Sequence, residues 1–366
     1  CWAFWNMAPG MGPRHFLYML QTEGSAMALA ERVRRGADRP HWLPKSTWAW
    51  ALRQGDPVQA GRREFERARA KKAELVPVGS AYYPERLREI GDAPPILYMA
   101  GRRPPKSPVW VSVVGSRQAS EYGVSMAFRF SADLGASGVA VASGLARGID
   151  AAAHRGAMSV GGYTAGVLGC GIGAPMTARL ERIVAEIVSC GCIMSPFPMG
   201  LPASTGTFPA RNRIISGMSS ACIVIEAAEV SGALITASFA VAQNRNVYVV
   251  PGDITRPTSR GGLALLSEGA TALGSVDKVV SELIAAGHVL KPGPTPREPT
   301  VSDHRRRGLT DNDVLVYAAV EDASSFESIQ RRVALPARQV MACLSRLELV
   351  GMVVRLDGLR FRKRSG

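Results

Sequence analysis

The chain has 366 residues, 46% hydrophobic and 20% charged, so it is long enough for two or three domains and has a globular composition. Lysine and arginine number 44 against 30 acidic residues, a formal charge of +14. Such an excess attracts polyanions and makes nucleic acid the first partner to consider, with an anionic membrane surface second. A solvated basic surface that binds no ligand would give the same excess of positive charge.

The six cysteines contain no CxxC pair, and in a chain of this length they indicate buried free thiols in a reducing compartment. The first residues interrupt their apolar character with Pro, Gly and Arg, unlike a signal peptide. No stretch reaches the roughly 18 consecutive apolar residues of a membrane span. We therefore expect a cytoplasmic protein that has no membrane partner. Because the first residue is Cys rather than Met, we expect the native start to lie upstream.

Short helical periods with mixed charges run through residues 1–75 and end in "REFERARAKKAELV", which predicts a helical N-terminal domain. A connecting segment follows, with Pro84, Pro94 and Pro95 placed before a short apolar strand at 96–99.

Apolar strands alternate with amphipathic helices in the next part of the chain. The strands are "VWVSVV", "VAVASG", "YTAGVLG", "CIMS", "ACIVIEAA" and "NVYVVPG", and the helix before "ACIVIEAA" is expected to begin near Arg211. Continuous apolar strands separated by helices indicate parallel strands covered on both faces. Residues 76–286 are therefore predicted to form a doubly wound α/β domain.

Residues 287–308 are rich in proline and charge and are predicted to be a linker. Residues 309–366 show three helices and then two short strands about a turn at Asp357 and Gly358, the layout of a winged helix. Apolar residues recur along the third helix. This helix could therefore pack in the core or bind a protein partner as well as it could bind duplex DNA. The basic residues that favour duplex binding are Arg338, Arg346, Arg360, Arg362, Lys363 and Arg364.

In a doubly wound sheet, ligands bind beyond the carboxyl ends of the strands. The first predicted strand ends in Gly115, Ser116 and Arg117, and the second ends in Ser143 and Gly144. Glycine lets a ligand approach the backbone, although it is often only turn geometry, and arginine offers a bidentate fork for phosphate. Neither loop is GxGxxG or a Walker A sequence, so we predict no dinucleotide and no ATP hydrolysis.

The stretch "GTFPARNRIISG" places Phe208, Arg211, Asn212 and Arg213 in a loop and first helical turn at the same sheet edge. Cations at a helix N-terminus oppose its dipole, so the two arginines are expected to need an anion. A structural alternative is pairing with a carboxylate such as Glu226. Arginine beside an aromatic ring is the combination that binds single-stranded nucleic acid.

Evidence in the sequence for catalysis is weak. Asp150 and His154 could share a metal, but no third ligand follows by spacing, and a hydrogen bond between the two is expected instead. Glu226 fits a catalytic carboxylate and a cap for the loop at Ser231 and Gly232 equally well. No Ser-His-Asp or Cys-His arrangement is evident, so we expect no catalytic residue, metal or cofactor.

The motifs together resemble the DNA-processing protein A family, also called DprA or Smf. Between residues 76 and 275 they are "YPERLREIGDAPPILYMAG", "VVGSRQASEYG", "ASGLARGIDAAAH", "GVLGCGI", "FPARNRIISGMS", "VIEAAEVSGALITASFAVAQNRNVYVVPGDI" and "LLSEGA". Departures from the family pattern are Gly173 in place of Asp, Pro196 in place of Glu and Leu263 in place of Asn.

The resemblance implies an extended Rossmann-like domain that binds single-stranded DNA without nucleotide hydrolysis, usually as a homodimer. It also implies that the protein protects incoming DNA in natural transformation and helps load the RecA recombinase. The DNA-binding residues carried over by motif are Gly115, Ser116, Arg117, Ser143, Gly144, Phe208, Arg211, Asn212 and Arg213.

Two other functions remain open from the sequence. Lysine-decarboxylase-like phosphoribohydrolases share this sheet type and would use Glu226 as acid or base, although their PGGxGT loop is absent and "VSGALIT" is the nearest analogue. A transcriptional regulator would read duplex DNA with the winged helix and sense a nucleotide with the α/β domain.

Overall fold

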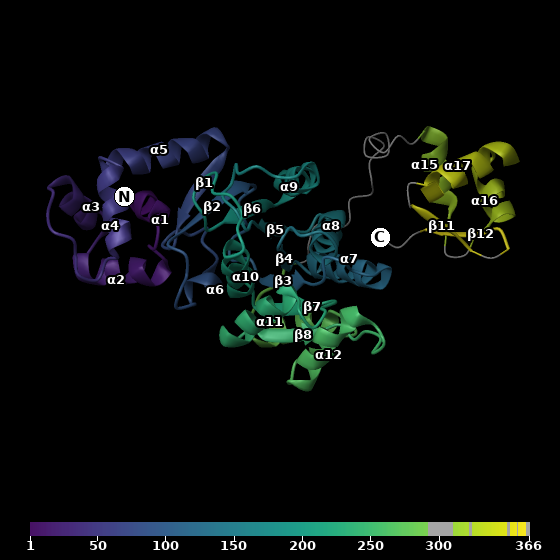
Figure 1. Ribbon diagram of the computed structural model, residues 1–366. Helices are drawn as coiled ribbons and strands as arrows, with labels where there is room; N and C mark the ends of the chain where they lie inside the picture. The colour runs from purple at the N-terminus through teal and green to yellow at the C-terminus, as the bar shows by residue number, and fades with distance from the viewer. Residues whose placement is uncertain (292–309, 322–323, 350–351, 357, 364–366) are drawn as a thin grey trace. The chain divides into compact units, whose positions relative to one another are not determined.

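The computed structural model describes residues 1–291, 310–321, 324–349, 352–356 and 358–363 (Figure 1). The chain divides into two compact units, Cys1–Thr295 and Pro296–Gly366. The first unit contains the N-terminal helices and a large sheet, and the described residues of the second contain three helices and a small sheet.

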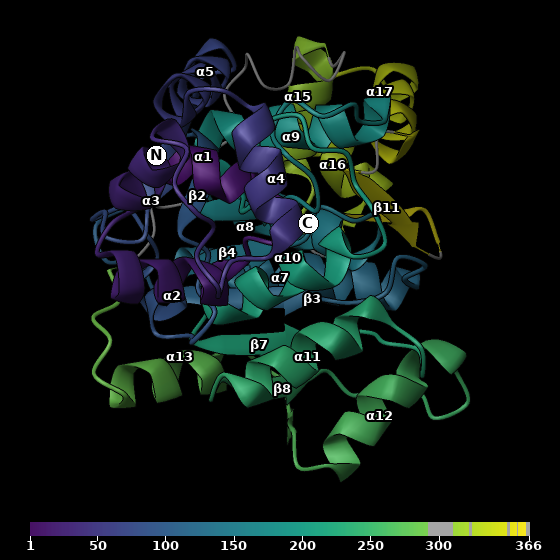
Figure 2. The same ribbon diagram turned by 60° about the vertical axis from the view of Figure 1, so that its left-hand side comes forward.

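Five helices begin the first unit and enclose an aromatic core that includes Phe4, Trp5 and Phe16. They lie beside the first two strands of the sheet in both views (Figures 1 and 2). The last of them ends earlier than the sequence predicted, because Lys72 adopts a φ of 53° and the following residues form a strand. The helices are α1 (Trp2–Met7), α2 (Pro13–Glu23), α3 (Ala26–Arg34), α4 (Lys45–Arg53) and α5 (Pro57–Ala70).

Nine strands form one sheet in the order β1-β2-β6-β5-β4-β3-β7-β8-β9. The pairs from β6 to β9 are parallel, whereas β1 and β2 extend the sheet in antiparallel fashion beyond β6. The strands are β1 (Ala73–Pro77), β2 (Ile96–Gly101), β3 (Trp110–Val114), β4 (Ala140–Ser143), β5 (Thr164–Val167), β6 (Cys192–Ser195), β7 (Ala221–Val224), β8 (Asn246–Val249) and β9 (Thr271–Ala272). The predicted doubly wound α/β sheet is confirmed.

Helices cover both faces of this sheet, which is why its central strands are buried on both sides and read as apolar runs. One face packs against α10 and α11, and the other packs against α7, α8 and α13. The helices are α6 (Glu85–Arg88), α7 (Glu121–Ala136), α8 (Ile149–Ser159), α9 (Ala178–Cys190), α10 (Thr207–Gly217), α11 (Gly232–Ala242), α12 (Arg260–Ser267) and α13 (Asp277–Ala285), with a 3-10 turn at Pro257–Ser259.

Strand β3 lies between β4 and β7, so the winding of the sheet reverses at the gap between β3 and β7. This reversal is the topological switch point at which open α/β sheets bind their ligands.

The second unit is a winged helix, as the sequence predicted. Val316, Ile329, Leu344 and Phe361 are buried in its core. Its elements are α15 (Asp311–Ala319), β10 (Ser324–Ser325), α16 (Phe326–Val333), α17 (Ala337–Leu349), β11 (Val353–Leu356) and β12 (Arg360–Lys363), with the strands in the order β10-β12-β11.

All six cysteines are free, and four of them are buried: Cys170, Cys192, Cys222 and Cys343. Among the described residues, none of the helices combines the length and apolar character needed to span a bilayer.

Candidate nucleic-acid interface

The loop after β3 is held at the switch point by backbone contacts. The Ser116 N–H donates to the Glu226 carbonyl after β7 at 2.7 Å, and the Ser116 carbonyl accepts from the Ile149 N–H at the start of α8 at 3.3 Å. A Cβ atom on Gly115 would lie 2.6 Å from the Ile149 side chain, so glycine is required there. The Ser116 hydroxyl accepts from the Gln118 N–H at 3.0 Å and therefore closes a turn.

Arg117 leaves this loop exposed to solvent and lies over the ring of Phe208, with its Cζ 5.5 Å from the ring centroid. Phe208 is 38% exposed, and a Cβ on Gly169 would lie 2.9 Å from its ring, so the ring rests against backbone. A cation and an accessible aromatic ring thus meet at the carboxyl edge of the sheet. This pair can bind a phosphate and stack a base.

Helix α10 begins at Thr207 and not near Arg211, so that prediction was wrong. Its N-cap, Gly206, makes no side-chain capping bond and leaves no sequence signal for the helix start. Phe208 lies in the first turn, while Arg211, Asn212 and Arg213 lie in the second. The expected opposition between the arginines and the helix dipole is correspondingly weak, because the dipole acts mainly within the first turn.

Arg211 is buried, with 5% of its surface exposed. Its Nη1 donates to the carbonyls of Gly144, after β4, and of Val167, at the end of β5, the latter at 2.9 Å. A Cβ on Gly144 would lie 2.2 Å from Nη1, so the glycine makes room for the guanidinium. Burial lowers the pKa of Arg211 and raises the pKa of Asp150, and the attraction between the two groups opposes both shifts. Arg211 therefore stabilises the site from its buried side, where it joins the ends of β4 and β5.

Two other predicted site residues, Ser143 and Asn212, make contacts that belong to the fold. The Ser143 hydroxyl is buried and donates to the Val113 carbonyl at 2.6 Å, which joins β4 to β3. The Asn212 amide donates to the Gly232 carbonyl at 3.1 Å, which joins α10 to α11.

Arg213 lies on the other flank of α10. It forms an ion pair of 2.8 Å with the carboxylate of Asp92 and also donates to the Asp92 carbonyl. The structure thus gathers six of the nine predicted residues at one edge, namely Gly115, Ser116, Arg117, Gly144, Phe208 and Arg211.

The expected hydrogen bond between Asp150 and His154 is absent among the described residues, so this prediction was wrong. Asp150 accepts from the Ala146 N–H at 3.2 Å, and the Nδ1 of His154 lies 2.7 Å from the Thr164 hydroxyl. That hydroxyl donates to the Val141 carbonyl, so Nδ1 carries the proton that is shared with it. Burial lowers the pKa of His154 to about 3, and Arg211 adds to the shift. No cluster of three metal ligands occurs in the described part of the chain.

Glu226 neither pairs with the arginines of α10 nor caps the loop at Ser231, which were the expected structural roles. Its buried carboxylate accepts from the Ser120 N–H at 2.9 Å and from the Ser120 hydroxyl at 2.5 Å, at the start of α7. Ser231 caps α11 itself by accepting from the Ala233 N–H. Because Ser120 engages both oxygens of Glu226, this carboxylate is poorly placed for acid or base catalysis.

In the winged helix, Arg346 is engaged within the fold and pairs with the buried Asp313 at 2.8 Å. Burial alone would raise the pKa of Asp313, but hydrogen bonds from Arg346 and Thr310 lower it to about 2. Lys363 lies over the ring of Tyr317 at 5.0 Å. Arg338, Arg360 and Arg362 are exposed, and Arg364 lies outside the described residues.

The sequence interpretation missed Glu64, a buried carboxylate on α5. It accepts the Met199 N–H at 2.7 Å and so holds the loop that leads from β6 to α10. Gly200 and Leu201 of the same loop bond to the backbone of residues 171 and 172. The spacing of residues along α5 could have indicated that Glu64 is buried, because it lies four residues from the buried Ala60 and Ala68 and on the same helical face.

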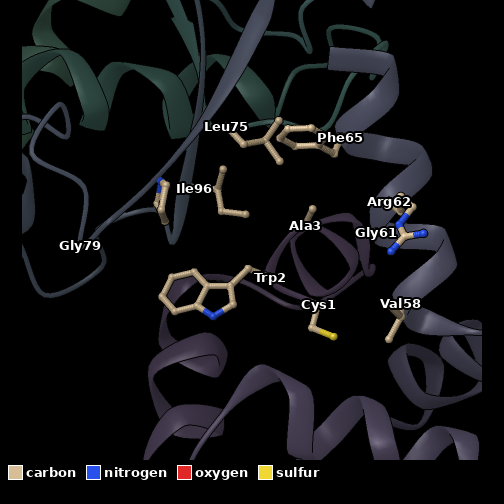
Figure 3. Close-up of a pocket in the computed structure, with 11 residues that line it drawn as sticks. Cys1, Trp2, Ala3, Val58, Gly61, Arg62, Phe65, Leu75, Gly79 and Ile96 are labelled. Atoms are coloured by element: carbon tan, nitrogen blue, oxygen red, sulfur yellow. The ribbon is translucent and has the colours of Figure 1, made fainter. Parts of the chain in front are cut away.

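Two cavities lie away from this interface. An apolar one of about 720 Å³ is lined by Trp2, Phe65, Leu75 and Ile96, between the N-terminal helices and the antiparallel strands (Figure 3). A polar one of about 590 Å³ includes Arg213 in its lining.

Comparison with known proteins supports the sequence resemblance. The family model described as DNA recombination-mediator protein A matches residues 74–284, and the DprA winged helix domain matches residues 310–358. Protein Smf of Escherichia coli K12 is 33% identical over 285 residues, which cover 78% of this chain and 76% of that protein. Protein Smf of Synechocystis sp. PCC 6803 is 34% identical, covering 77% of this chain and 78% of that protein.

Among solved structures, DNA processing protein A from Streptococcus pneumoniae matches with a TM-score of 0.65 at 29% identity, covering 76% of this chain and 96% of that chain. DNA processing protein A from Helicobacter pylori, whose structure is described for its single-stranded DNA binding mode, has a TM-score of 0.52. At 22% identity, with 59% of this chain and 98% of that chain covered, the second match shows the fold alone.

The fold and site define a Rossmann-like α/β protein that has a cationic, aromatic strand-end site and a winged helix. The chain belongs to the DNA recombination-mediator protein A family, known as DprA or Smf. The family resemblance and fold class predicted from the sequence are confirmed.

Proposed function

We propose that this protein binds single-stranded DNA at the carboxyl edge of its sheet, without hydrolysing nucleotide. The observation that carries the proposal is the meeting of Arg117, in the loop after β3, with Phe208, in the first turn of α10, at the carboxyl edge of the sheet. In the bound state Arg117 turns from the ring to a phosphate, and a base takes its place on Phe208. The buried Arg211 adds positive potential beneath the strand, and glycines at 115 and 144 let Ile149 and Arg211 pack closely under the site.

The single-strand binding mode described for the Helicobacter pylori protein and the +14 charge of this chain support the same proposal. By family membership, we infer that the protein protects incoming DNA and assists RecA loading in natural transformation and homologous recombination. We further infer that it acts as a cytoplasmic homodimer and not as an enzyme. The domains proposed for these roles are 1–75, 76–286 and 309–366, with a linker at 287–308.

Fluorescence anisotropy with oligo-dT and with duplex DNA, both without ATP, tests the central proposal. We expect tighter binding of the single strand, weakened by salt and by Arg117→Ala. Equal affinity of wild type and Arg117→Ala for oligo-dT would overturn the site. Incubation with nucleoside monophosphates tests the phosphoribohydrolase alternative, and release of free base that depends on Glu226 would overturn the non-enzymatic role.

A further inference from the structure

A polar cleft of about 590 Å³ lies between four segments that are distant in the sequence. Helix α2 contributes Arg14, α6 and the turn after it contribute Arg86, Glu89 and Asp92, and α10 contributes Arg213. The end of α11 and the residues after it complete the cleft, including Arg245. None of the contacts described above for the Arg117 site uses this space.

The cleft carries an excess of positive charge, with four guanidinium groups facing two carboxylates. Glu89 is shared by Arg86 at 3.1 Å and Arg245 at 3.2 Å, while Asp92 pairs with Arg213. Arg14 is exposed and forms no ion pair with any residue in the described ranges. Four cations less two anions leave a formal +2, which an anionic ligand would neutralise.

Other lining groups suit a nucleoside phosphate in particular. Phe239 offers an aromatic surface for a base. Gln243 donates to the Arg213 carbonyl at 3.1 Å, while its own Oε1 is buried and accepts no hydrogen bond from the described residues. Asn244 presents an exposed amide beside it. The aromatic ring and the side-chain amides can bind a base, and the excess of arginines can bind a phosphate.

Helix α10 connects this cleft to the first site. Residues 211 and 213 differ by about 200° around a helix, so Arg211 faces the sheet edge while Arg213 faces the cleft. Phe208 and Arg213 are separated by only about 7.5 Å along the helix axis. Around the axis they differ by about 140°, so a strand that leaves Phe208 would have to pass around α10 to reach the cleft.

We propose that the cleft binds a further nucleotide of the same DNA strand, with its phosphate on Arg14 and Arg213 and its base on Phe239. This inference rests on the proposed single-strand binding. A free nucleotide has the same chemistry, so the test has to distinguish the two sources.

The test compares Arg14→Glu and Asn244→Asp with the matched charge reversal Arg53→Glu, at an exposed arginine on α4 that lines neither cavity. Asp tolerates the positive φ of 56° at position 244 as Asn does, and it adds one negative charge to the cleft. Affinity is measured by anisotropy for oligo-dT of about 2 nucleotides, too short to extend from Phe208 to the cleft, and of about 25 nucleotides, and circular dichroism confirms that each variant is folded.

We expect each cleft variant to weaken the long oligonucleotide about tenfold more than Arg53→Glu does, with a change of less than about twofold for the short one. The same loss of affinity in all three variants would overturn the proposed cleft site, because the change in net charge alone would then explain the loss. Arg117→Ala should instead weaken the short oligonucleotide, so failure of the first site is seen separately. Calorimetry with thymidine monophosphate tests a free nucleotide as the ligand. If its binding requires Arg14 while the cleft variants affect long and short oligonucleotides equally, the ligand of the cleft is a free nucleotide and not the DNA strand.

Discussion

Arg117, after β3, and Phe208, in the first turn of α10, are distant in the sequence and meet with the guanidinium carbon 5.5 Å from the ring centroid. Each is exposed enough to contact a ligand. The Phe208 ring rests against the backbone at Gly169, and Arg117 forms no ion pair with any of the described residues. The pair is poised for exchange because the cation–π contact is modest in energy, about 0.5–1 kcal/mol at exposed sites. A stacked base and a phosphate can replace it.

Replacing Arg117 by Ala should weaken oligo-dT binding roughly tenfold and reduce the slope of log affinity against log salt by about 0.7, the value for one phosphate contact on a single strand. Unfolding in urea should be unchanged, because the side chain is exposed. Arg117→Lys keeps the charge and should retain the salt slope while losing part of the affinity. An unchanged slope in Arg117→Ala would contradict a phosphate contact.

Arg211→Ala should lower the free energy of unfolding by about 2–4 kcal/mol, because the carbonyls of Gly144 and Val167 lose a buried donor. Urea denaturation measures this effect. The control is Arg147→Ala in the neighbouring loop, which is exposed and should change stability by less than about 0.5 kcal/mol. Equal stability of the two variants would show that Arg211 is not needed beneath the strand ends.

Gly144→Ala should displace the Arg211 guanidinium, because the new Cβ would lie 2.2 Å from Nη1 and 2.7 Å from the Asp150 carboxylate. We expect a loss of at least about tenfold in affinity for oligo-dT, with a smaller loss of stability than in Arg211→Ala. Gly206→Ala is the matched control, since a Cβ at position 206 meets nothing within 4 Å. Similar binding by the two variants would argue against the close packing at Gly144.

Glu64→Ala should loosen the loop before α10, because the Met199 N–H then loses its buried acceptor. Hydrogen exchange at Met199 should become faster, and oligo-dT affinity should fall severalfold as Phe208 loses its fixed position. Glu64→Gln retains an acceptor oxygen and should restore both measurements. If Glu64→Ala speeds exchange but binds DNA as wild type does, Glu64 has no role in positioning the site.

His154 should make the first unit less stable in mild acid. Its pKa falls from an ordinary 6.5 to about 3 on burial, so between these values the unfolded chain binds a proton that the folded chain does not. Stability is therefore complete above pH 6.5 and decreases as the pH falls toward 3, by about 2 kcal/mol between pH 7 and pH 5. Urea unfolding at both pH values should show this decrease in wild type but a smaller one in His154→Gln. Equal decreases would mean that the histidine is protonated within the fold.

The strands and helices of the α/β core and of the winged helix could be predicted because their signals are local. Continuous apolar runs marked β3 to β8, and helical periods marked the segments between them. The antiparallel β1 was missed because its five residues follow a helix with the same mixed charge. The start of α10 was misplaced because Gly206 provides no capping side chain.

The family, the order of the elements and the presence of arginine and phenylalanine near the strand ends follow from the sequence alone. The surface that each of these side chains faces, and the partner that it contacts, depend on the tertiary structure. Arg117 is exposed, whereas Arg211 donates to two carbonyls and Arg213 pairs with Asp92 on the far flank of the same helix. The physical reason is that a charged group is engaged by whichever partner the fold brings near it, and for each of these arginines that partner is distant in the chain.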